Sequence, residues 1–244
     1  MKGYNYSLLA EHYDILEDNG EIQKINHMLD NLLQKNNVKT VLDLTCGTGA
    51  QSIFLHKQGY QVTASDYCQE MIDIAKRKTD KLKFYCADMR NAQFEKHDAV
   101  ITIYNSIAHL TPEDFEKALE NIKSNLNHGG VYIFDIFNLH FLKENLVNQE
   151  FIDVAKEVDE VKYVRFNNNR LNIGDGIMNV NQKTYIQKGI EEPNIFEESW
   201  DMQTYSPNRL KQILERNGYS PLILSMDGNE FDNGLSILCI ATTE

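Results

Sequence analysis

The sequence of 244 residues has little of what membrane, secreted or nucleic-acid-binding proteins need. It contains no run of about 18 or more apolar residues, and its start lacks the basic and then apolar pattern of a secretion signal. Lys and Arg total 24 against 36 Asp and Glu, which gives a net charge of −12. Phosphate backbones need clustered Lys and Arg for neutralisation. We therefore expect no membrane partner, no nucleic-acid partner and a cytoplasmic location.

Cysteine is also scarce, and the four residues are Cys46, Cys68, Cys86 and Cys239. They are too far apart for a CxxC zinc or redox pair, so we expect no metal site. Because they fall in predicted strands or in a glycine-containing loop, we expect small buried apolar side chains in a reducing compartment. The length suits one large domain, or one domain with an inserted lid, and leaves the oligomeric state open.

A glycine turn follows the first predicted strand. Residues 38–52 read Val-Lys-Thr-Val-Leu-Asp-Leu-Thr-Cys-Gly-Thr-Gly-Ala-Gln-Ser, which predicts a buried strand, a turn and the start of a helix. The third glycine of the dinucleotide-binding fingerprint is missing after Gly47 and Gly49. Asp43, where the strand ends, would repel a pyrophosphate and attract an ammonium or sulfonium group. The pattern therefore favours S-adenosylmethionine over NAD.

The stretch from Val41 to Gly49 resembles motif I of the class I S-adenosylmethionine-dependent methyltransferases, written (Asp/Glu)-x-Gly-x-Gly-x-Gly. Thr45 stands in place of its first glycine. Taken alone, Gly-x-Gly after a strand is equally compatible with a tight turn. The resemblance implies cofactor contacts from the loop residues Asp43, Thr45, Cys46, Gly47 and Gly49.

Two more predicted strands end in carboxylates. Residues 61–66 end at Asp66, whose carboxylate would accept hydrogen bonds from two ribose hydroxyls. Capping the helix predicted over residues 69–78 is its alternative role. Asp88 ends the third strand and would accept a hydrogen bond from an adenine amino group, and Met89 would pack on the adenine ring. Their alternative roles are the start of a loop for Asp88 and core packing for Met89. Further cofactor contacts are predicted for Tyr67 and Met71.

Residues 1–37 combine tyrosines with an amphipathic helix. Apolar residues repeat at helical spacing from Ile22 to Leu33, which predicts core packing. Tyr13, followed by an aspartate, resembles the N-terminal segment with which many small-molecule methyltransferases close over the methionine end of the cofactor. This implies a cofactor contact for Tyr13 and a substrate contact for Tyr6. Packing of the tyrosines on the sheet is an equal alternative.

Residues 98–110 read Asp-Ala-Val-Ile-Thr-Ile-Tyr-Asn-Ser-Ile-Ala-His-Leu, a predicted buried strand and a polar run. Tyr104 and Asn105 would lie at the carboxyl end of this strand, where the sheet order reverses and reacting groups belong. The run is not the Asn-Pro-Pro-Tyr with which methyltransferases grip exocyclic base amines, so nucleobase methylation is not expected.

Asn-Ser-Ile-Ala-His-Leu instead resembles Asn-Ser-Phe-Ala-His-Leu of the glycine and glycine-sarcosine N-methyltransferases, and related runs occur in the amino-sugar N-methyltransferases. His109 is the candidate proton acceptor, with a structural role in the loop as its alternative. Tyr104 is predicted to serve catalysis and cofactor binding, and Asn105 to contact the substrate.

Thr111-Pro112-Glu113-Asp114 predicts the start of a helix, and Gly129-Gly130 predicts its end. A strand over residues 131–137 follows, with Asn138 at its mouth. The resemblance to the glycine N-methyltransferases implies that Asn138 helps to hold the substrate. Phe137 replaces the basic residue of that family, which argues against glycine itself.

Residues 139–204 are predicted to form an antiparallel β lid. Strand-like stretches at 161–166 and 177–186 are joined by Asn167-Asn168-Asn169, which predicts a turn. Arg165 and Trp200 are the predicted substrate contacts of the lid. The candidates to face a pocket, each with a solvated or core position as its alternative, are Arg165, Tyr185, Glu197, Glu198, Trp200 and Tyr205.

The element order predicts an α/β fold, a doubly wound seven-stranded Rossmann-like sheet with one antiparallel strand plus the small β lid. Residues 38–138 and 205–244 form the sheet domain, and residues 1–37 a helical segment that covers the cofactor. The predicted function is methyl transfer from S-adenosylmethionine to a small molecule, at an amine nitrogen of amino-acid or amino-sugar type, which leaves S-adenosylhomocysteine. The alternatives are a small-molecule O-methyltransferase, an RNA or protein methyltransferase and a non-catalytic S-adenosylmethionine-binding protein.

Overall fold

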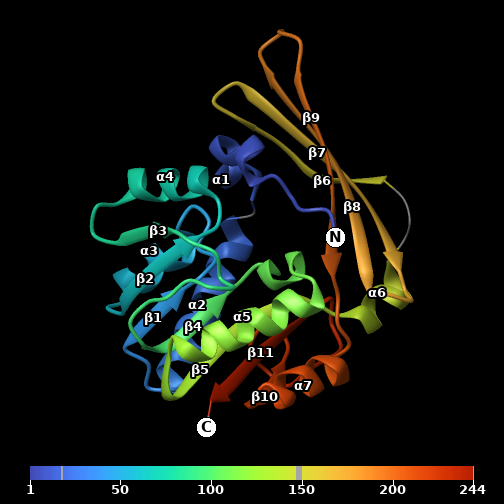
Figure 1. The fold of residues 1–244 in the computed structure, drawn as a ribbon. Helices are drawn as coiled ribbons and strands as arrows, with labels where there is room; N and C mark the ends of the chain where they lie inside the picture. The colour runs from blue at the N-terminus through green and yellow to red at the C-terminus, as the bar shows by residue number, and fades with distance from the viewer. Residues whose placement is uncertain (18, 147–149, 244) are drawn as a thin grey trace.

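The computed structural model describes residues 1–17, 19–146 and 150–243. Its main sheet has seven strands in the order β10-β11-β5-β4-β1-β2-β3 (Figure 1). They are β1 (Thr40–Asp43), β2 (Gln61–Asp66), β3 (Lys83–Cys86), β4 (His97–Thr102), β5 (Leu126–Phe137), β10 (Tyr219–Leu224) and β11 (Ser236–Thr243). β11 runs antiparallel to β5 and β10, and the pairings from β3 to β5 are parallel. The predicted α/β sheet with one antiparallel strand is confirmed.

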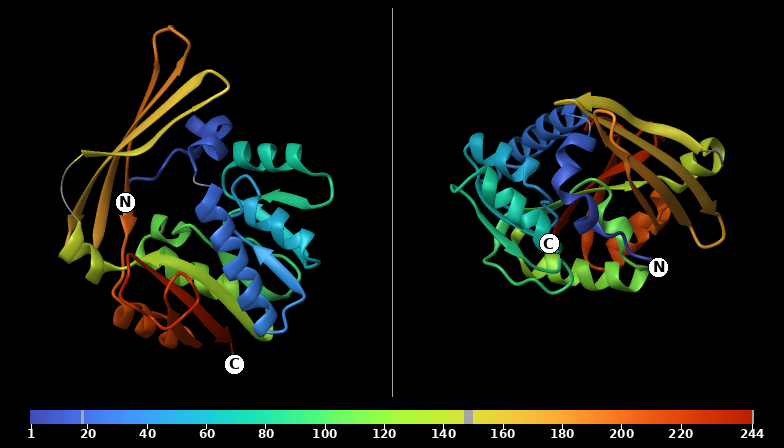
Figure 2. Two further views of the ribbon diagram at one scale, coloured as in Figure 1. Left: turned by 180° about the vertical axis from the view of Figure 1, so that it is seen from behind. Right: turned by 90° about the horizontal axis from the view of Figure 1, so that it is seen from above.

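Helices cover both faces of this sheet, α5 and α7 on one and α2 and α3 on the other (Figures 1 and 2). The helices around the sheet are α2 (Asn19–Lys35), α3 (Ala50–Lys57), α4 (Gln69–Lys78), α5 (Pro112–Ser124) and α7 (Pro207–Arg216). Successive strand residues point to opposite faces, so Leu42 packs in the cluster of Phe115 while Val41 packs with Leu29. Within the described ranges, no helix is long and apolar enough to span a bilayer.

A second sheet, with the order β6-β7-β8-β9, stands to one side of the first (Figure 1). Its strands, antiparallel throughout, are β6 (Glu150–Val158), β7 (Val161–Asn172), β8 (Ile177–Lys188) and β9 (Asn194–Gln203), and α6 (Leu139–Asn145) precedes them. We call it the lid sheet. One end of it packs through Val180 and Trp200 into the cluster of Phe115, and the other packs through Tyr163 and Ile186 on the N-terminal residues.

The turn predicted at Asn167-Asn168-Asn169 is wrong, because these residues lie inside β7 and pair with residues 180–182 of β8. The hairpin turn comes later, at residues 173–176. Asparagine favours turns only as a local tendency, and the cross-strand pairing of a long hairpin overrides it.

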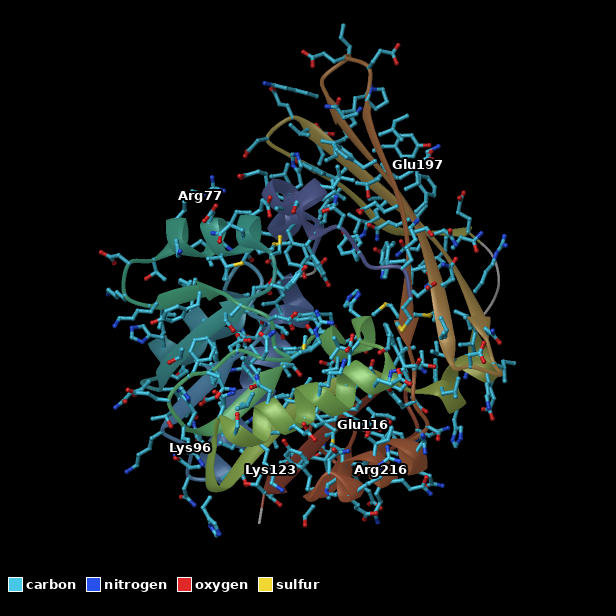
Figure 3. All side chains as sticks on the ribbon, viewed as in Figure 1. Arg77, Lys96, Glu116, Lys123, Glu197 and Arg216 are labelled. Carbon is cyan, nitrogen blue, oxygen red and sulfur yellow. The ribbon has the colours of Figure 1, made fainter. Side chains whose placement is uncertain are left out.

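The N-terminal strap, residues 1–17, lies between α4 and the lid sheet (Figure 2). It contains the 3₁₀ helix η1 (Tyr6–His12) and the short helix α1 (Tyr13–Leu16). Arg77, labelled on α4 in Figure 3, pairs with Glu11 of the strap at 2.7 Å. On the other side, the backbone N–H of Lys2 donates to Asp201 of β9 at 2.8 Å. The strap thus connects the helix layer with the lid sheet.

Two further local expectations are wrong. α5 ends at Ser124, and Gly129-Gly130 lie inside β5. Gly129 has a φ of 71° and lies beside a register shift between β4 and β5. The glycine therefore permits the irregular backbone of the strand at this point. Cys86 is exposed because β3 is an edge strand, whereas the other three cysteines are buried as expected.

Asp98 joins the beginnings of β1 and β4 to β5. Its carboxylate accepts from the backbone N–H groups of Lys39 and Thr40, both at 3.0 Å, and from Asn127 Nδ2 at 2.9 Å. Burial raises the pKa of Asp98, but these hydrogen bonds outweigh it and hold the pKa below its ordinary value. The ionised carboxylate therefore stabilises the fold.

We expect Asp98→Asn to lower the free energy of unfolding at pH 7 by about 1–3 kcal/mol, because several donors lose a charged acceptor. A lowered folded-state pKa gives stability that is present above the unfolded pKa and is lost as the pH falls through the folded pKa. The difference between the two proteins in urea unfolding should therefore shrink in acid. Asp80→Asn, at an exposed position, is the control. A difference independent of pH would contradict this account.

Candidate functional site

A buried carboxylate shapes the loop between β1 and α3. Asp43 accepts hydrogen bonds from Ser52 Oγ at 2.6 Å and from the backbone N–H of Thr45 at 3.3 Å. Burial raises the pKa of Asp43 to about 7 in spite of these bonds. Asp43 is almost fully buried, so it holds the loop from inside, and its predicted contact with the cofactor stays a prediction.

The two glycines of this loop have different surroundings. Gly47 and Gly49 both have positive φ, 51° and 88°. A Cβ on Gly49 would lie 3.2 Å from the ring of Phe84 and 3.3 Å from Ile53, whereas a Cβ on Gly47 would meet no atom of the described residues within 4 Å. Gly49 therefore allows close packing against β3, and Gly47 leaves its backbone open to a ligand.

Asp66, at the end of β2, connects this loop to α4. Its Oδ2 accepts from the backbone N–H of Gly47 at 2.8 Å, and its Oδ1 accepts from that of Cys68 at 2.9 Å. The parallel pairing of β1 with β2 brings the two strand ends to one edge. Burial raises the pKa of Asp66 while the backbone hydrogen bonds oppose this shift. The carboxylate thus supports the start of α4, which is the alternative role predicted for Asp66, and it also lines cavities at this edge of the sheet.

Three adjoining hollows lie along this edge. The loop hollow is lined by Tyr6, Tyr13, Asp14, Glu17, Ile22, Thr45, Cys46, Gly47, Thr48, Ala50, Gln51, Asp66, Met71, Ile103, Tyr104 and Ser106. The β3 hollow includes Tyr4, Tyr6, Thr45, Asp66, Tyr67, Cys68, Asp88, Met89, Arg90, Ser106, His109 and Asp114. The lid hollow includes Tyr4, Tyr6, Leu9, Tyr13, Leu16, Glu17, Tyr104, His109, Asp153, Arg165, Asn167, Gln182, Trp200 and Met202. Tyr6 lines all three.

Most of the predicted site residues line these hollows. Of the predicted cofactor residues that the structure describes, only Asp43 and Gly49 do not line the loop or β3 hollow. Of the predicted substrate residues in the same ranges, only Asn105 and Asn138 do not line the lid hollow. Among the described residues, no group of three or more His, Cys, Asp or Glu side chains is arranged to hold a metal ion.

The strap reaches the end of β4 through Tyr6. Tyr6 Oη lies 2.9 Å from His109 Nε2, and the Tyr6 ring contacts that of Tyr4, which in turn packs on Trp200 with ring centroids 4.4 Å apart. Burial lowers the pKa of His109 to about 4 and raises the pKa of Tyr6. Both groups are therefore neutral near pH 7, and the imidazole is free of a proton on one ring nitrogen.

Tyr104 and Asn105, just after β4, have unusual backbone conformations. Their φ values are 63° and 55°, in a region that non-glycine residues rarely adopt. Asp135 of β5 supports this turn, because its Oδ2 accepts from the backbone N–H of Asn105 at 3.1 Å. Burial raises the pKa of Asp135 to about 7. Strain of this kind persists only where the surroundings impose it, and it concentrates at functional sites.

Asp88 is engaged by a neighbouring arginine. Arg90 Nε lies 3.0 Å from both carboxylate oxygens, and Arg90 Nη1 lies 2.8 Å from Asp114 Oδ2. The hydrogen bonds from Arg90 hold the pKa of Asp88 below its ordinary value. A contact between Asp88 and an adenine amino group would compete with this ion pair and stays a prediction.

Glu17 lies at the site although no sequence pattern identified it. It lines the loop and lid hollows, and its side chain is 23% exposed. Arg165 of β7 approaches Glu17 Oε1 at 3.5 Å and Asp153 Oδ2 at 2.5 Å. Burial raises the pKa of Glu17, and Arg165 opposes this shift. No motif marks this acid, because only the folding of the strap under the lid sheet takes it out of solvent.

Asn138 serves the fold rather than the hollows. It is fully buried, and its Oδ1 accepts from the backbone N–H of His140 at the start of α6. Its Nδ2 donates to Asn233 Oδ1 at 2.9 Å and to the carbonyl of Gly234 at 3.0 Å. The side chain is therefore used within the protein, and its position does not support the expected substrate contact.

Several lid candidates also have structural positions. Glu197, labelled on the lid sheet in Figure 3, pairs with Lys183 at 2.7 Å in an exposed position. Tyr205 packs against Phe115 in the core, with ring centroids 5.8 Å apart. Tyr185 contacts the ring of Phe166. For these residues the solvated or core alternative describes the structure better than a place at the lid hollow.

The sequence is similar to known methyltransferases over part of its length. Residues 41–130, which include the β1 loop, Asp66 and the end of β4, match the methyltransferase domain family. A glycine/sarcosine N-methyltransferase from Aphanothece halophytica is 37% identical over 111 residues, which cover 42% of this chain and 42% of that protein. The chain thus matches less than half of that relative's length.

Solved structures extend the similarity to the whole chain. An S-adenosylmethionine-dependent methyltransferase from Clostridium acetobutylicum has a TM-score of 0.79 at 22% identity, over 97% of this chain and 96% of that chain. The sugar N-methyltransferase KedS8 from Streptoalloteichus has a TM-score of 0.79 at 18% identity, over 100% and 94%. Because coverage is nearly complete, the shared fold includes the lid sheet.

The loop glycines provide a paired test. Gly47→Ala should cost about 1–2 kcal/mol of unfolding free energy, the strain of an L-residue at positive φ. Gly49→Ala should cost more, because its Cβ would also press on Phe84. Urea unfolding of the two variants measures the difference. Equal losses would contradict the packing role of Gly49.

His109 should make stability depend on pH. The pKa of His109 is about 4 in the folded protein, below its value in the unfolded chain, so the unfolded chain binds a proton at a higher pH than the folded protein does. Stability is therefore lost as the pH falls from about 6.5 towards 4. In His109→Gln this loss is removed. The unfolding free energy of the unmutated protein should therefore fall more steeply over this range. His128→Gln, at an exposed position, is the control; parallel curves for His109→Gln and the unmutated protein would refute the buried neutral imidazole.

Proposed function

We propose that this protein, which belongs to the class I S-adenosylmethionine-dependent methyltransferases, transfers a methyl group to an amine nitrogen of a small molecule. The observation that carries this acceptor class is the lid hollow. It adjoins the loop hollow along a shared wall of Tyr6, Tyr13, Glu17 and Tyr104, and it combines aromatic with acidic side chains. The N-methyltransferase names of the relatives support the same acceptor class.

The residues present fit S-adenosylmethionine in the loop and β3 hollows. Gly47 leaves its backbone open, and the Asp66 carboxylate, which accepts one backbone bond at each oxygen, keeps lone pairs for ribose hydroxyls. Thr45 Oγ1 is buried and, among the described residues, has no hydrogen-bond partner, so it is available for a hydrogen bond with a polar group of the ligand. Further cofactor contacts are proposed for Tyr13, Cys46, Tyr67, Met71, Asp88, Met89 and Tyr104.

S-adenosylmethionine supplies a methyl group on a positively charged sulfonium. That methyl group would pass to the lone pair of an amine nitrogen, with the electron pair of the C–S bond left on sulfur. An acceptor that binds as an ammonium group would have to release one proton before this lone pair is available. The contribution of this chain is to align the acceptor and to exclude water. The strap and the lid sheet, which meet around Tyr6 and Trp200, enclose the place where this occurs.

His109 is the proposed acceptor of the released proton. It lines the β3 and lid hollows, and it is neutral near pH 7 because burial lowers its pKa to about 4. Its low pKa makes it a weak base, so it would hold this proton only briefly before passing it to solvent. Tyr6, which is hydrogen-bonded to His109, would relay the proton: its oxygen accepts one proton while its own passes to Nε2. Tyr104, on the shared wall, is proposed to orient the acceptor.

Arg165 and Trp200 are proposed to hold the remainder of the acceptor. Both line the lid hollow, and Trp200 presents an aromatic surface beside Tyr4. The net charge of −12 favours the approach of a cationic molecule over an anionic one. A small amine therefore suits the site better than a nucleic acid.

Methyl-labelled S-adenosylmethionine tests this function. The protein is incubated with the label and a cell extract, which is then separated into metabolite, RNA and protein fractions. Label should enter a metabolite, and mass spectrometry should locate the new methyl group on nitrogen. A methyl group on oxygen, or label in RNA or protein, would contradict the proposed acceptor. Cofactor binding without label in any fraction would indicate a non-catalytic protein.

Asp66→Asn should weaken S-adenosylmethionine binding at least about ten-fold in calorimetry, because an amide has one accepting oxygen where the carboxylate has two. Asp73→Asn, on the exposed side of α4, is the matched control and should leave the affinity unchanged. Thermal unfolding of both variants checks that the loop after β1 still folds. Equal affinity in Asp66→Asn and the unmutated protein would rule out the ribose contact.

A further inference from the structure

We infer that Glu17 binds the ammonium group of the acceptor and thereby selects amines over alcohols. This inference rests on the function proposed above and assigns the acceptor specificity of that site to one residue. It depends on the position of Glu17, on the charges around it and on the aromatic rings beside it.

Glu17 stands where two hollows meet. Four of the described residues line both the loop hollow and the lid hollow, and three of them are tyrosines. Glu17 is the fourth and the charged member of this shared wall. The acceptor nitrogen must reach the methyl group across this wall, since the loop hollow suits the cofactor and the lid hollow suits the acceptor. A carboxylate at this point therefore lies next to the reacting nitrogen.

The charges around Glu17 leave room for a cation. Arg165 lies 2.5 Å from Asp153 but 3.5 Å from Glu17, so its closer partner is Asp153. The nearby Lys156 Nζ donates to the backbone carbonyl of Glu17 at 3.1 Å. Arg165 and Lys156 together match the charges of Glu17 and Asp153, but neither cation forms a close ion pair with the Glu17 carboxylate. Among the described residues its ion-pair partner is Arg165 at 3.5 Å, so an ammonium group could approach this carboxylate more closely.

A ligand cation would also relieve the burial of this acid. Burial raises the pKa of Glu17, which means that the surroundings disfavour its charged form. An ammonium group within hydrogen-bonding distance favours the ionised carboxylate and gains charge-assisted hydrogen bonds from it. A neutral alcohol offers a single hydroxyl donor and no charge. The carboxylate thus discriminates between the two acceptor classes through its charge.

Aromatic rings complete this environment. Glu17 lies one helical turn after Tyr13, whose carbonyl accepts from the backbone N–H of Glu17 at 3.1 Å. The Tyr6 ring lies beside it, with the Tyr6 and Tyr13 centroids 6.5 Å apart. Burial raises the pKa of both tyrosines, so both rings stay neutral. Their faces attract an ammonium group and its methylated forms through cation–π interactions.

A competing role follows from the same position. Because Glu17 also lines the loop hollow, its carboxylate could instead bind the amino group of the cofactor. In that case its loss would weaken S-adenosylmethionine binding, whereas the inferred role requires this affinity to stay the same. The two roles therefore differ in a measurable quantity.

The test uses the full chain, labelled S-adenosylmethionine and a dilution series of the metabolite fraction of a cell extract. Glu17→Gln keeps the shape of the side chain and removes its charge. It should need at least about ten times more of the fraction to reach half of its maximal N-methylation rate, with S-adenosylmethionine affinity within about two-fold of the unmutated protein. Glu17→Asp, which restores the charge, should recover part of the loss.

Glu11→Gln is the matched control, because Glu11 lies on the same strap but pairs with Arg77 at the exposed surface. It should leave the dilution curve unchanged. An unaltered curve for Glu17→Gln, or a loss of cofactor affinity in that variant, would overturn the inference while amine methylation by the unmutated protein still stands. If the unmutated protein methylates no amine in the fraction, the proposed function fails and this inference fails with it.

Discussion

The site depends on the two backbone hydrogen bonds that Asp66 accepts, from Gly47 at 2.8 Å and from Cys68 at 2.9 Å. They tie the loop after β1 to the start of α4, and they are possible only because parallel pairing places the ends of β1 and β2 at one edge. The backbone donors offset part of the cost of burying this carboxylate, whose pKa stays raised by burial. The same edge provides the walls of the loop and β3 hollows.

The second half of the site comes from parts far apart in the chain. The strap crosses from α4 to the lid sheet. On one side Thr48 Oγ1 donates a hydrogen bond to Asp14 at 2.6 Å, and on the other the backbone N–H of Lys2 donates to Asp201. Tyr6 therefore lines all three hollows. Apolar side chains add to these polar contacts, because Leu9 and Leu16 of the strap pack against Tyr163 and Ile186 of the lid sheet.

Buried acids and strained backbone concentrate at this edge. Asp43 and Asp135 both have a pKa raised to about 7 by burial, and each supports a loop through backbone donors. The turn at Tyr104 and Asn105 departs from the backbone conformations preferred by such residues. These features lower stability in isolation, and proteins retain them where they position functional groups. They mark the same place as the three hollows do.

The sequence by itself determined the order of strands and helices, the glycine loop and the carboxylate at Asp66, because these depend on local periodicity and short motifs. The position at the end of a buried strand marked Tyr104 and His109, and the family resemblance covers the run from Asn105 to Leu110. Only the tertiary structure decided that Asn138 bonds within the protein and that Glu17 joins the site. Neither position follows from local pattern, because burial and hydrogen-bond partners arise when the strap, the lid sheet and the main sheet pack together.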